Sequence, residues 1–136
     1  MNLMNKKSHS KYSTKNLNKS HLIQFGKIGF KSLGFQCLKK NELNTIEWLI
    51  SKKIKKLHFK KKIKFWNLIS LNLNLTKLSP ESRMGKGKGF IYTQAIFIRP
   101  GIILFEFDNL TIWQSTILVN FLKKILSVNF VIVQKY

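Results

Sequence analysis

Residues 91–108 read IYTQAIFIRPGIILFEFD and carry the strongest strand signal in the chain. Two runs rich in β-branched and aromatic residues, 91–99 and 102–108, lie on either side of Pro100-Gly101. Such runs are typical of strands, and a Pro-Gly pair is typical of a turn. We therefore predict two strands that are joined at Pro100-Gly101 and paired as a hairpin.

Two acids near the end of this stretch, Glu106 and Asp108, alternate with Phe105 and Phe107. Successive side chains of a strand point to opposite faces, so the acids would share one face and the rings the other. We expect the acids on an exposed strand face and at the start of a helix, rather than as an acid/base pair.

Helical spacing identifies two helices outside this stretch. Near 40–57, apolar residues recur three or four positions apart, and polar residues occupy the rest of the surface. These apolar residues are Leu43, Ile46, Ile50, Ile54 and Leu57, with Trp48 expected at the edge of the packed face. A second helix is predicted at about 111–125, starting after Asp108 or Asn109. Its buried side would include Leu118, Phe121, Leu122 and Ile125.

The remaining segments give three further strand signals and one long loop. Residues 25–38, 62–70 and 128–134 are rich in aromatic and β-branched residues. Residues 71–90 contain Asn, Pro and Gly at positions that interrupt any periodicity, so we predict a loop there. A loop of this length in a small domain is usually functional.

The chain therefore divides into a tail and one domain. Residues 1–24 are expected to form a basic, extended N-terminal tail. Residues 25–136 are expected to form a single α+β domain, with two helices packed on a mixed or antiparallel sheet.

The net charge of the chain limits the kinds of partner that it can bind. The chain has 25 Lys and Arg against 5 Asp and Glu, a formal net charge of +20 over 136 residues. A compact fold with this charge repels itself unless a polyanion lies beside it, either a nucleic-acid backbone or an anionic membrane surface. Hydrophobic residues make up 44% of the chain, which excludes a merely disordered basic tail. The longest runs free of charge and Asn, 89–98 and 110–119, are too short to span a membrane.

The tail is basic and lacks acids. Its lysines are Lys6, Lys7, Lys11, Lys15 and Lys19. A mitochondrial targeting peptide also lacks acids, but it usually carries Arg and an apolar face, and this segment has neither. We predict that these lysines contact RNA.

Other lysines are further candidates for RNA contact. Eight of them fall between positions 52 and 64, and two more lie in the first strand segment. They are Lys27, Lys31, Lys52, Lys53, Lys55, Lys56, Lys60, Lys61, Lys62 and Lys64. Arg, the better fork for phosphate, occurs only at Arg83 and Arg99.

The sharpest motif lies within the predicted loop. It is Arg83-Met84-Gly85-Lys86-Gly87-Lys88-Gly89. Three alternating glycines leave the backbone unshielded, the lysines between them supply cations, and Arg83 adds a bidentate donor. Such a loop can press amides and cations into a crowded phosphate array. A solvent-exposed flexible loop is the alternative.

The motif does not match either of two nucleotide-binding loops that would indicate an enzyme. A Walker loop needs four residues between its first Gly and Gly-Lys-Ser/Thr, and no Ser or Thr follows Lys88. A dinucleotide fingerprint needs a helix after it, whereas the segment after Gly89 predicts a strand. We expect no enzymatic activity, no cofactor and no catalytic residue.

Other candidate chemistry is sparse. His9, His21 and His58 share no metal-ligand spacing with Cys37, the single cysteine, so no metal site is expected. Trp48, Trp66, Trp113 and the eleven Phe are expected mostly in the core. One of these rings could stack on a base, and the sequence does not say which.

Three segments together resemble a known family. They are Phe25–Gly34, Ser79–Gly89 and Arg99–Glu106, and the Arg-Met-Gly-Lys-Gly-Lys-Gly string is highly specific. They are similar to large-subunit ribosomal protein sixteen of the bacterial and organellar type. The likeness runs from about Phe25 to the C-terminus, and the tail fits by character only.

The resemblance implies a two-layer α/β-hammerhead fold and a structural role in translation. It implies a place at the base of the central protuberance of the large subunit, on rRNA and beside neighbouring ribosomal proteins. The family's loop points towards the tRNA acceptor region near the peptidyl-transferase centre, which assigns rRNA and tRNA contact to the Arg83–Gly89 motif. In bacteria the arginine that matches Arg83 can be hydroxylated. The abundant Asn, Ile, Phe and Lys have A/T-rich codons, which favours an organelle, mitochondrion before plastid.

The chain departs from the family pattern at several positions. Phe35 and Cys37 stand where the family commonly has basic residues, and Tyr92-Thr93-Gln94 replaces a Glu-Tyr-Trp run. A basic residue usual near Leu68 is absent too.

Two other classes remain as alternatives. A basic peripheral membrane or nucleoid-packaging protein would also account for the charge, but not for the glycine-lysine loop. A small nuclease would need a carboxylate cluster for a metal ion, and five scattered acids do not supply one.

Overall fold

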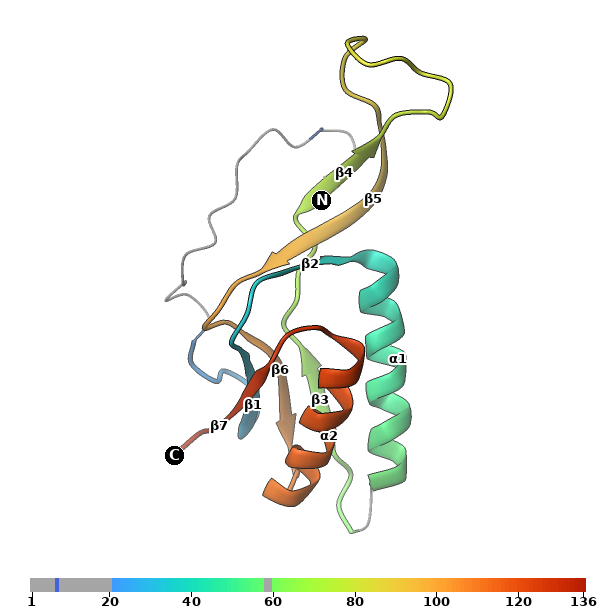
Figure 1. Cartoon of the computed structure of the whole chain (residues 1–136). Helices are drawn as coiled ribbons and strands as arrows, with labels where there is room; N and C mark the ends of the chain where they lie inside the picture. Colours follow the sequence, from blue (N-terminus) through green and yellow to red (C-terminus); the bar gives the residue numbers. More distant parts are fainter. Residues whose placement is uncertain (1–6, 8–20, 58–59) are drawn as a thin grey trace.

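The computed structural model describes residue 7, residues 21–57 and residues 60–136. Its elements follow in the order β1 (Ile28–Ser32), β2 (Gln36–Lys39), α1 (Lys40–Leu57), β3 (Lys64–Asn67), β4 (Leu73–Lys77), β5 (Phe90–Ile98), β6 (Ile103–Asp108), α2 (Ile112–Ile125) and β7 (Phe130–Gln134). One sheet has the order β3-β6-β1-β7 and the other has the order β2-β5-β4, and all pairings are antiparallel. The α+β class predicted from the sequence is confirmed (Figure 1).

The predicted hairpin is wrong, because β5 and β6 lie in different sheets. Instead, residues 95–107 run as one bent segment beside residues 28–39. The pairing register continues across the bend: Lys31 lies opposite Ile103, and five residues further along, Gln36 lies opposite Ile98. A single bent antiparallel ladder therefore contributes strands to both sheets.

Backbone contacts at the bend explain why Pro100-Gly101 does not close a hairpin. Gly101 has a φ of 89°, which favours glycine because L side chains rarely adopt it. Its N–H donates to the Ser32 carbonyl at 2.8 Å, and the Ser32 N–H donates to the Ile102 carbonyl at 2.8 Å. The groups that a hairpin would have paired are thus bonded elsewhere: β6 to β1, and β5 to β2 and β4.

The predicted loop is also shorter than expected, because β4 occupies Leu73–Lys77. β4 pairs with β5 from Leu73 opposite Ala95 to Lys77 opposite Phe90. Asparagines indicated a loop here, but Asn74 is buried in the strand, and Leu73 and Leu75 alternate with it as in a sheet. Only residues 78–89 form the loop, and β4 and β5 carry it away from the helices (Figure 1).

Both predicted helices are confirmed, and they share one hydrophobic core with the sheet. In α1 the buried residues are the five of the predicted stripe, and in α2 they include Leu118 and Leu122. Phe30, Phe105 and Phe107 from the central strands are fully buried in the same core. The Phe30 and Phe107 rings lie 4.8 Å apart between centroids.

The start of α2 is fixed by a capping box, one residue later than predicted. The Thr111 hydroxyl accepts from the Gln114 N–H, and the Gln114 side-chain carbonyl accepts from the Thr111 N–H. The Gln114 side-chain amide also donates to the Leu57 carbonyl at 2.7 Å. One buried glutamine therefore caps α2 and satisfies the end of α1.

Glu106 does not lie on an exposed strand face, so that expectation is wrong. Its side chain is fully buried. The carboxylate accepts from the backbone N–H groups of Gln24, Phe25 and Gly26 at 2.9, 2.6 and 2.9 Å. Glu106 thus holds residues 24–26, at the start of the domain, against β6 through three charge-assisted hydrogen bonds.

Replacing Glu106 by Gln should lower the free energy of unfolding by about 2 kcal/mol, because an amide nitrogen would face N–H donors that now have a carboxylate. Urea denaturation of the two proteins measures the difference. Asp108→Asn is the matched control, since Asp108 is only half-buried and accepts one local bond, from the Asn109 N–H. Equal losses from both substitutions would contradict the role assigned to Glu106.

Candidate nucleic-acid interface

The glycine-lysine loop lies at the end of the β4–β5 extension, exposed to solvent. Arg83, Met84, Lys86 and Lys88 are all exposed, Met84 at 95%. Gly85 and Gly87 have φ values of 93° and 92°, and a Cβ at either position would meet nothing within 4 Å. These two glycines are therefore required by backbone conformation and not by crowding.

Gly89 is required for a different reason, which is close approach to β4. A Cβ on Gly89 would lie 2.3 Å from the Lys77 carbonyl oxygen. No side chain fits there without moving the β4 backbone. The third glycine of the motif therefore closes the base of the loop onto the strand that supports it.

A tail residue also contacts the base of the loop. The Lys7 ammonium donates to the Lys88 carbonyl at 2.9 Å and lies 5.8 Å from the centroid of the Phe90 ring. Phe90 and Tyr92 are exposed on β5 next to the loop. The loop end of the molecule thus combines cations, bare backbone and exposed rings, which suits contact with phosphates and bases.

A second group of cations lies at the opposite end of the molecule, around the end of α1 (Figure 1). Lys53 is half-buried, and the other lysines of the group are exposed. These are Lys52, Lys55, Lys56, Lys60, Lys61, Lys62 and Lys64. Helix α1 has 18 residues and so spans roughly 27 Å, which separates this group from the end of the helix nearer the loop. Lys55 and Lys56 also fall in the last turn, where cations suit the helix dipole.

The remaining candidate lysines are scattered. Lys27 is exposed and Lys31 is half-buried on β1 between β6 and β7. The other tail lysines, Lys6, Lys11, Lys15 and Lys19, lie outside the described residues, as does most of the predicted tail. The structure therefore brings the candidates together in two clusters, at the loop and at the end of α1.

Two tryptophans that were expected in the core are exposed. Trp48 on α1 is 61% exposed and Trp113 at the start of α2 is 65% exposed, whereas Trp66 is half-buried. The Lys52 ammonium lies over the Trp48 ring, 4.9 Å from its centroid. The only sequence signal for Trp48 was its position outside the apolar stripe of α1.

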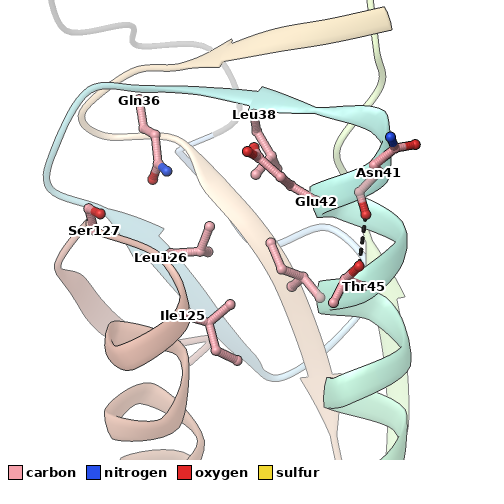
Figure 2. Close-up of a pocket in the computed structure, with 9 residues that line it drawn as sticks. Gln36, Leu38, Asn41, Glu42, Thr45, Ile125, Leu126 and Ser127 are labelled. Carbon is pink, nitrogen blue, oxygen red and sulfur yellow. Dashed lines mark hydrogen bonds between the residues drawn. The ribbon is translucent and has the colours of Figure 1, made fainter. Parts of the chain in front are cut away.

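A hollow of about 470 Å³ lies between β2, the start of α1 and the end of α2. Figure 2 shows Gln36, Glu42 and Leu126 among the side chains around it. The Gln36 side-chain oxygen is buried there and has no hydrogen-bond partner among the described residues. Glu42 accepts from the Lys39 N–H and so caps α1. This hollow offers acceptors and apolar side chains, and it is not part of either cationic cluster.

The chemistry that an enzyme would need is sparse in the described part of the chain. No group of three or more His, Cys, Asp or Glu lies together there in a way that could hold a metal ion. Burial, and secondly the Glu42 charge, raise the pKa of the Cys37 thiol, so it is not a ready nucleophile at neutral pH. Among the described residues, no helix has the length and apolar character needed to cross a bilayer.

Phe35 and Cys37, the two positions at which the resemblance implies basic residues, lie next to and on β2. Phe35 stacks on Phe97 with ring centroids 5.3 Å apart, and Cys37 is half-buried on β2. This part of the surface thus carries an aromatic pair and a thiol in this chain.

Comparisons with known proteins show the family of the chain. The model of the family "Ribosomal protein L16p/L10e" matches residues 2–127. The chain is 46% identical over 130 residues to large ribosomal subunit protein uL16m of Chondrus crispus, covering 95% of this chain and 94% of that protein. It is 35% identical over 115 residues to uL16m of Acanthamoeba castellanii, covering 83% and 74%, respectively. It is 33% identical over 89 residues to uL16 of Wigglesworthia glossinidia brevipalpis, covering 65% and 62%.

Fold, charge and family match together define a structural ribosomal protein and not an enzyme. The chain belongs to the ribosomal protein L16p/L10e family, as a large-subunit protein of the mitochondrial type that functions in translation in the mitochondrion. The match begins at residue 2, so it includes the tail that the sequence motifs had related to the family by character only.

Substituting Gly89 by Ala should open the base of the loop, because the new Cβ would collide with the Lys77 carbonyl. Amide hydrogen exchange at Lys77 and Phe90 should become at least about tenfold faster, a local loss of roughly 1.4 kcal/mol. Gly85→Ala is the control: it faces open space, so its strain should remain in the loop and leave the β4 amides protected. Unchanged exchange in the Gly89 variant would show that the strands do not need this contact.

Proposed function

We propose that this protein binds large-subunit rRNA at the base of the central protuberance and helps to position tRNA near the aminoacyl site. The observation that carries the proposal is the loop of residues 83–89. It presents Arg83, Lys86 and Lys88 to solvent on a backbone that two positive-φ glycines hold open. Cations and unshielded amides in one projecting loop are suited to a dense phosphate array.

The two cationic clusters suggest a division of labour. The cluster at the end of α1 lies on the body of the domain, where it can anchor the protein on rRNA. The loop projects on its own pair of strands and can reach a second RNA, the tRNA acceptor or elbow region (Figure 1). In this arrangement residues 25–136 form one RNA-binding domain that bridges rRNA and tRNA.

The tail completes the proposed interface. Residues 1–24 would follow rRNA in extended form, with their lysines beside phosphates. The contact from Lys7 to the Lys88 carbonyl supports a tail that passes beside the loop. Neighbouring large-subunit proteins are the other expected partners, and peptidyl transfer itself belongs to RNA.

Co-sedimentation with the large subunit through a salt gradient tests rRNA binding. Each phosphate that the protein neutralises releases counterions, so the logarithm of the binding constant should fall steeply and linearly with the logarithm of salt concentration. Equal affinity for DNA or for anionic liposomes would favour the packaging or membrane alternatives instead.

Changing Lys86 and Lys88 together to Ala should slow accommodation of aminoacyl-tRNA while subunit assembly remains near normal. In this proposal the loop contacts tRNA, whereas the lysines at the end of α1 anchor the protein on rRNA. Changing Lys55, Lys60 and Lys62 to Ala should instead reduce incorporation into the subunit, and the salt slope should fall by roughly one per lost phosphate contact. Sedimentation of subunits and the rate of accommodation measure the two effects. Equal assembly defects from both sets would contradict the division of labour.

A further inference from the structure

Trp48 and Lys52 form a stacked pair on the solvent side of α1. They are four residues apart, so they lie on the same face of the helix, away from the buried stripe of Ile46, Ile50 and Ile54. The ammonium lies 4.9 Å from the centroid of the indole ring. Trp48 nevertheless keeps 61% of its surface exposed, an unusual position for so large an apolar side chain.

A second cation–aromatic pair lies beside the first and joins α1 to α2. The Lys53 ammonium lies 5.3 Å from the centroid of the Phe121 ring. Leu49, Lys52, Lys53, Lys56 and Phe121 line a groove of about 210 Å³ between the helices. Lys52, whose ammonium lies over the Trp48 indole, therefore also lines a groove with two further lysines, Lys53 and Lys56.

A base-binding site requires an exposed ring with a cation beside it, and the three tryptophans differ in these two properties. Trp66 is half-buried, with its ring centroid 6.3 Å from that of Phe25. Trp113 is as exposed as Trp48, but within the described part of the chain no lysine ammonium lies over its ring. Of the three tryptophans, only Trp48 combines an exposed indole with a lysine ammonium over its ring, as far as residues 7, 21–57 and 60–136 show.

We infer that Trp48 stacks on an unpaired RNA base, and that Lys52, Lys53 and Lys56 bind the phosphates flanking that nucleotide. This inference rests on the proposed rRNA-binding function and deepens it, because it names a single-stranded element as the ligand of this face. Aromatic rings bordered by cations bind single-stranded nucleic acid through stacking and backbone neutralisation. Bases inside a duplex are already stacked and would not reach the ring.

The ammonium groups and the planar indole of this face favour a nucleotide over other occupants. An acidic protein segment would satisfy the ammonium groups but offers no planar group to match the indole. A membrane surface would demand a broad apolar face, whereas Trp48 is a single exposed ring with the Lys52 ammonium over it. Both occupants are outcomes of the experiment below.

The experiment measures fluorescence anisotropy of a labelled twelve-nucleotide single-stranded RNA and of a labelled RNA duplex with the full chain. Trp48→Ala should weaken binding to the single strand by roughly tenfold, the usual effect of losing one stacked base, and leave duplex binding unchanged. Trp48→Phe should retain most of the affinity. Trp113→Ala is the matched control and should change neither affinity, and thermal unfolding checks that each variant is folded.

Each outcome decides one question. Equal losses for single strand and duplex, or equal losses from Trp48→Ala and Trp113→Ala, would overturn stacking at Trp48. A loss of binding to phosphatidylserine vesicles that matches the loss for RNA would assign this face to a membrane surface. Impaired subunit incorporation with unchanged RNA affinity would assign it to a protein partner. If the unsubstituted chain binds neither RNA, the rRNA-binding function itself fails, which separates that failure from failure of this inference.

Discussion

The bent antiparallel ladder between residues 28–39 and 95–107 is the constraint on which the rest of the structure depends. It supplies β1 and β6, the two central strands of one sheet, and β5, the central strand of the other. Because the register continues through the bend, the two sheets cannot shift independently along it. The helices pack on the first sheet, and the second carries the loop outward, so the bend sets where the loop lies relative to the lysines at the end of α1.

Local properties could be predicted from the sequence, and long-range pairing could not. Helix α1 follows from the spacing of its own apolar residues, and the structure confirms its bounds. Pro100-Gly101 signals a change of direction, but its partner is the Ser32 backbone, far away in the sequence, and so a bend was taken for a hairpin. Glu106 was placed on the exposed face for the same reason. The backbone that covers it, residues 24–26, carries no periodic signal that would announce the contact.

The candidate interface also has a local part, which the sequence predicts, and a part that depends on packing, which it does not. The loop could be found from its residues alone, because glycine freedom and lysine charge are properties of the segment itself, and the φ values of Gly85 and Gly87 agree with that reasoning. Trp48 could not be singled out, since large aromatic residues are buried by default and spacing placed it only at an edge. Its distinction from Trp66 and Trp113 comes from its exposure together with the Lys52 ammonium over its ring.

The chain has few acids and most of them bond within the fold, so its positive charge must be balanced by a partner. Four of the five accept hydrogen bonds within the fold: Glu42, Glu47, Glu106 and Asp108. These acids serve helix capping, sheet attachment and a turn, and five acids in all cannot balance the charge of 25 basic residues. Salt then acts in opposite directions on the two states of the protein. It screens self-repulsion and stabilises the free chain, and it weakens the phosphate contacts that hold the bound chain. A fold arranged in this way is most stable when an RNA backbone takes the place of the missing acids.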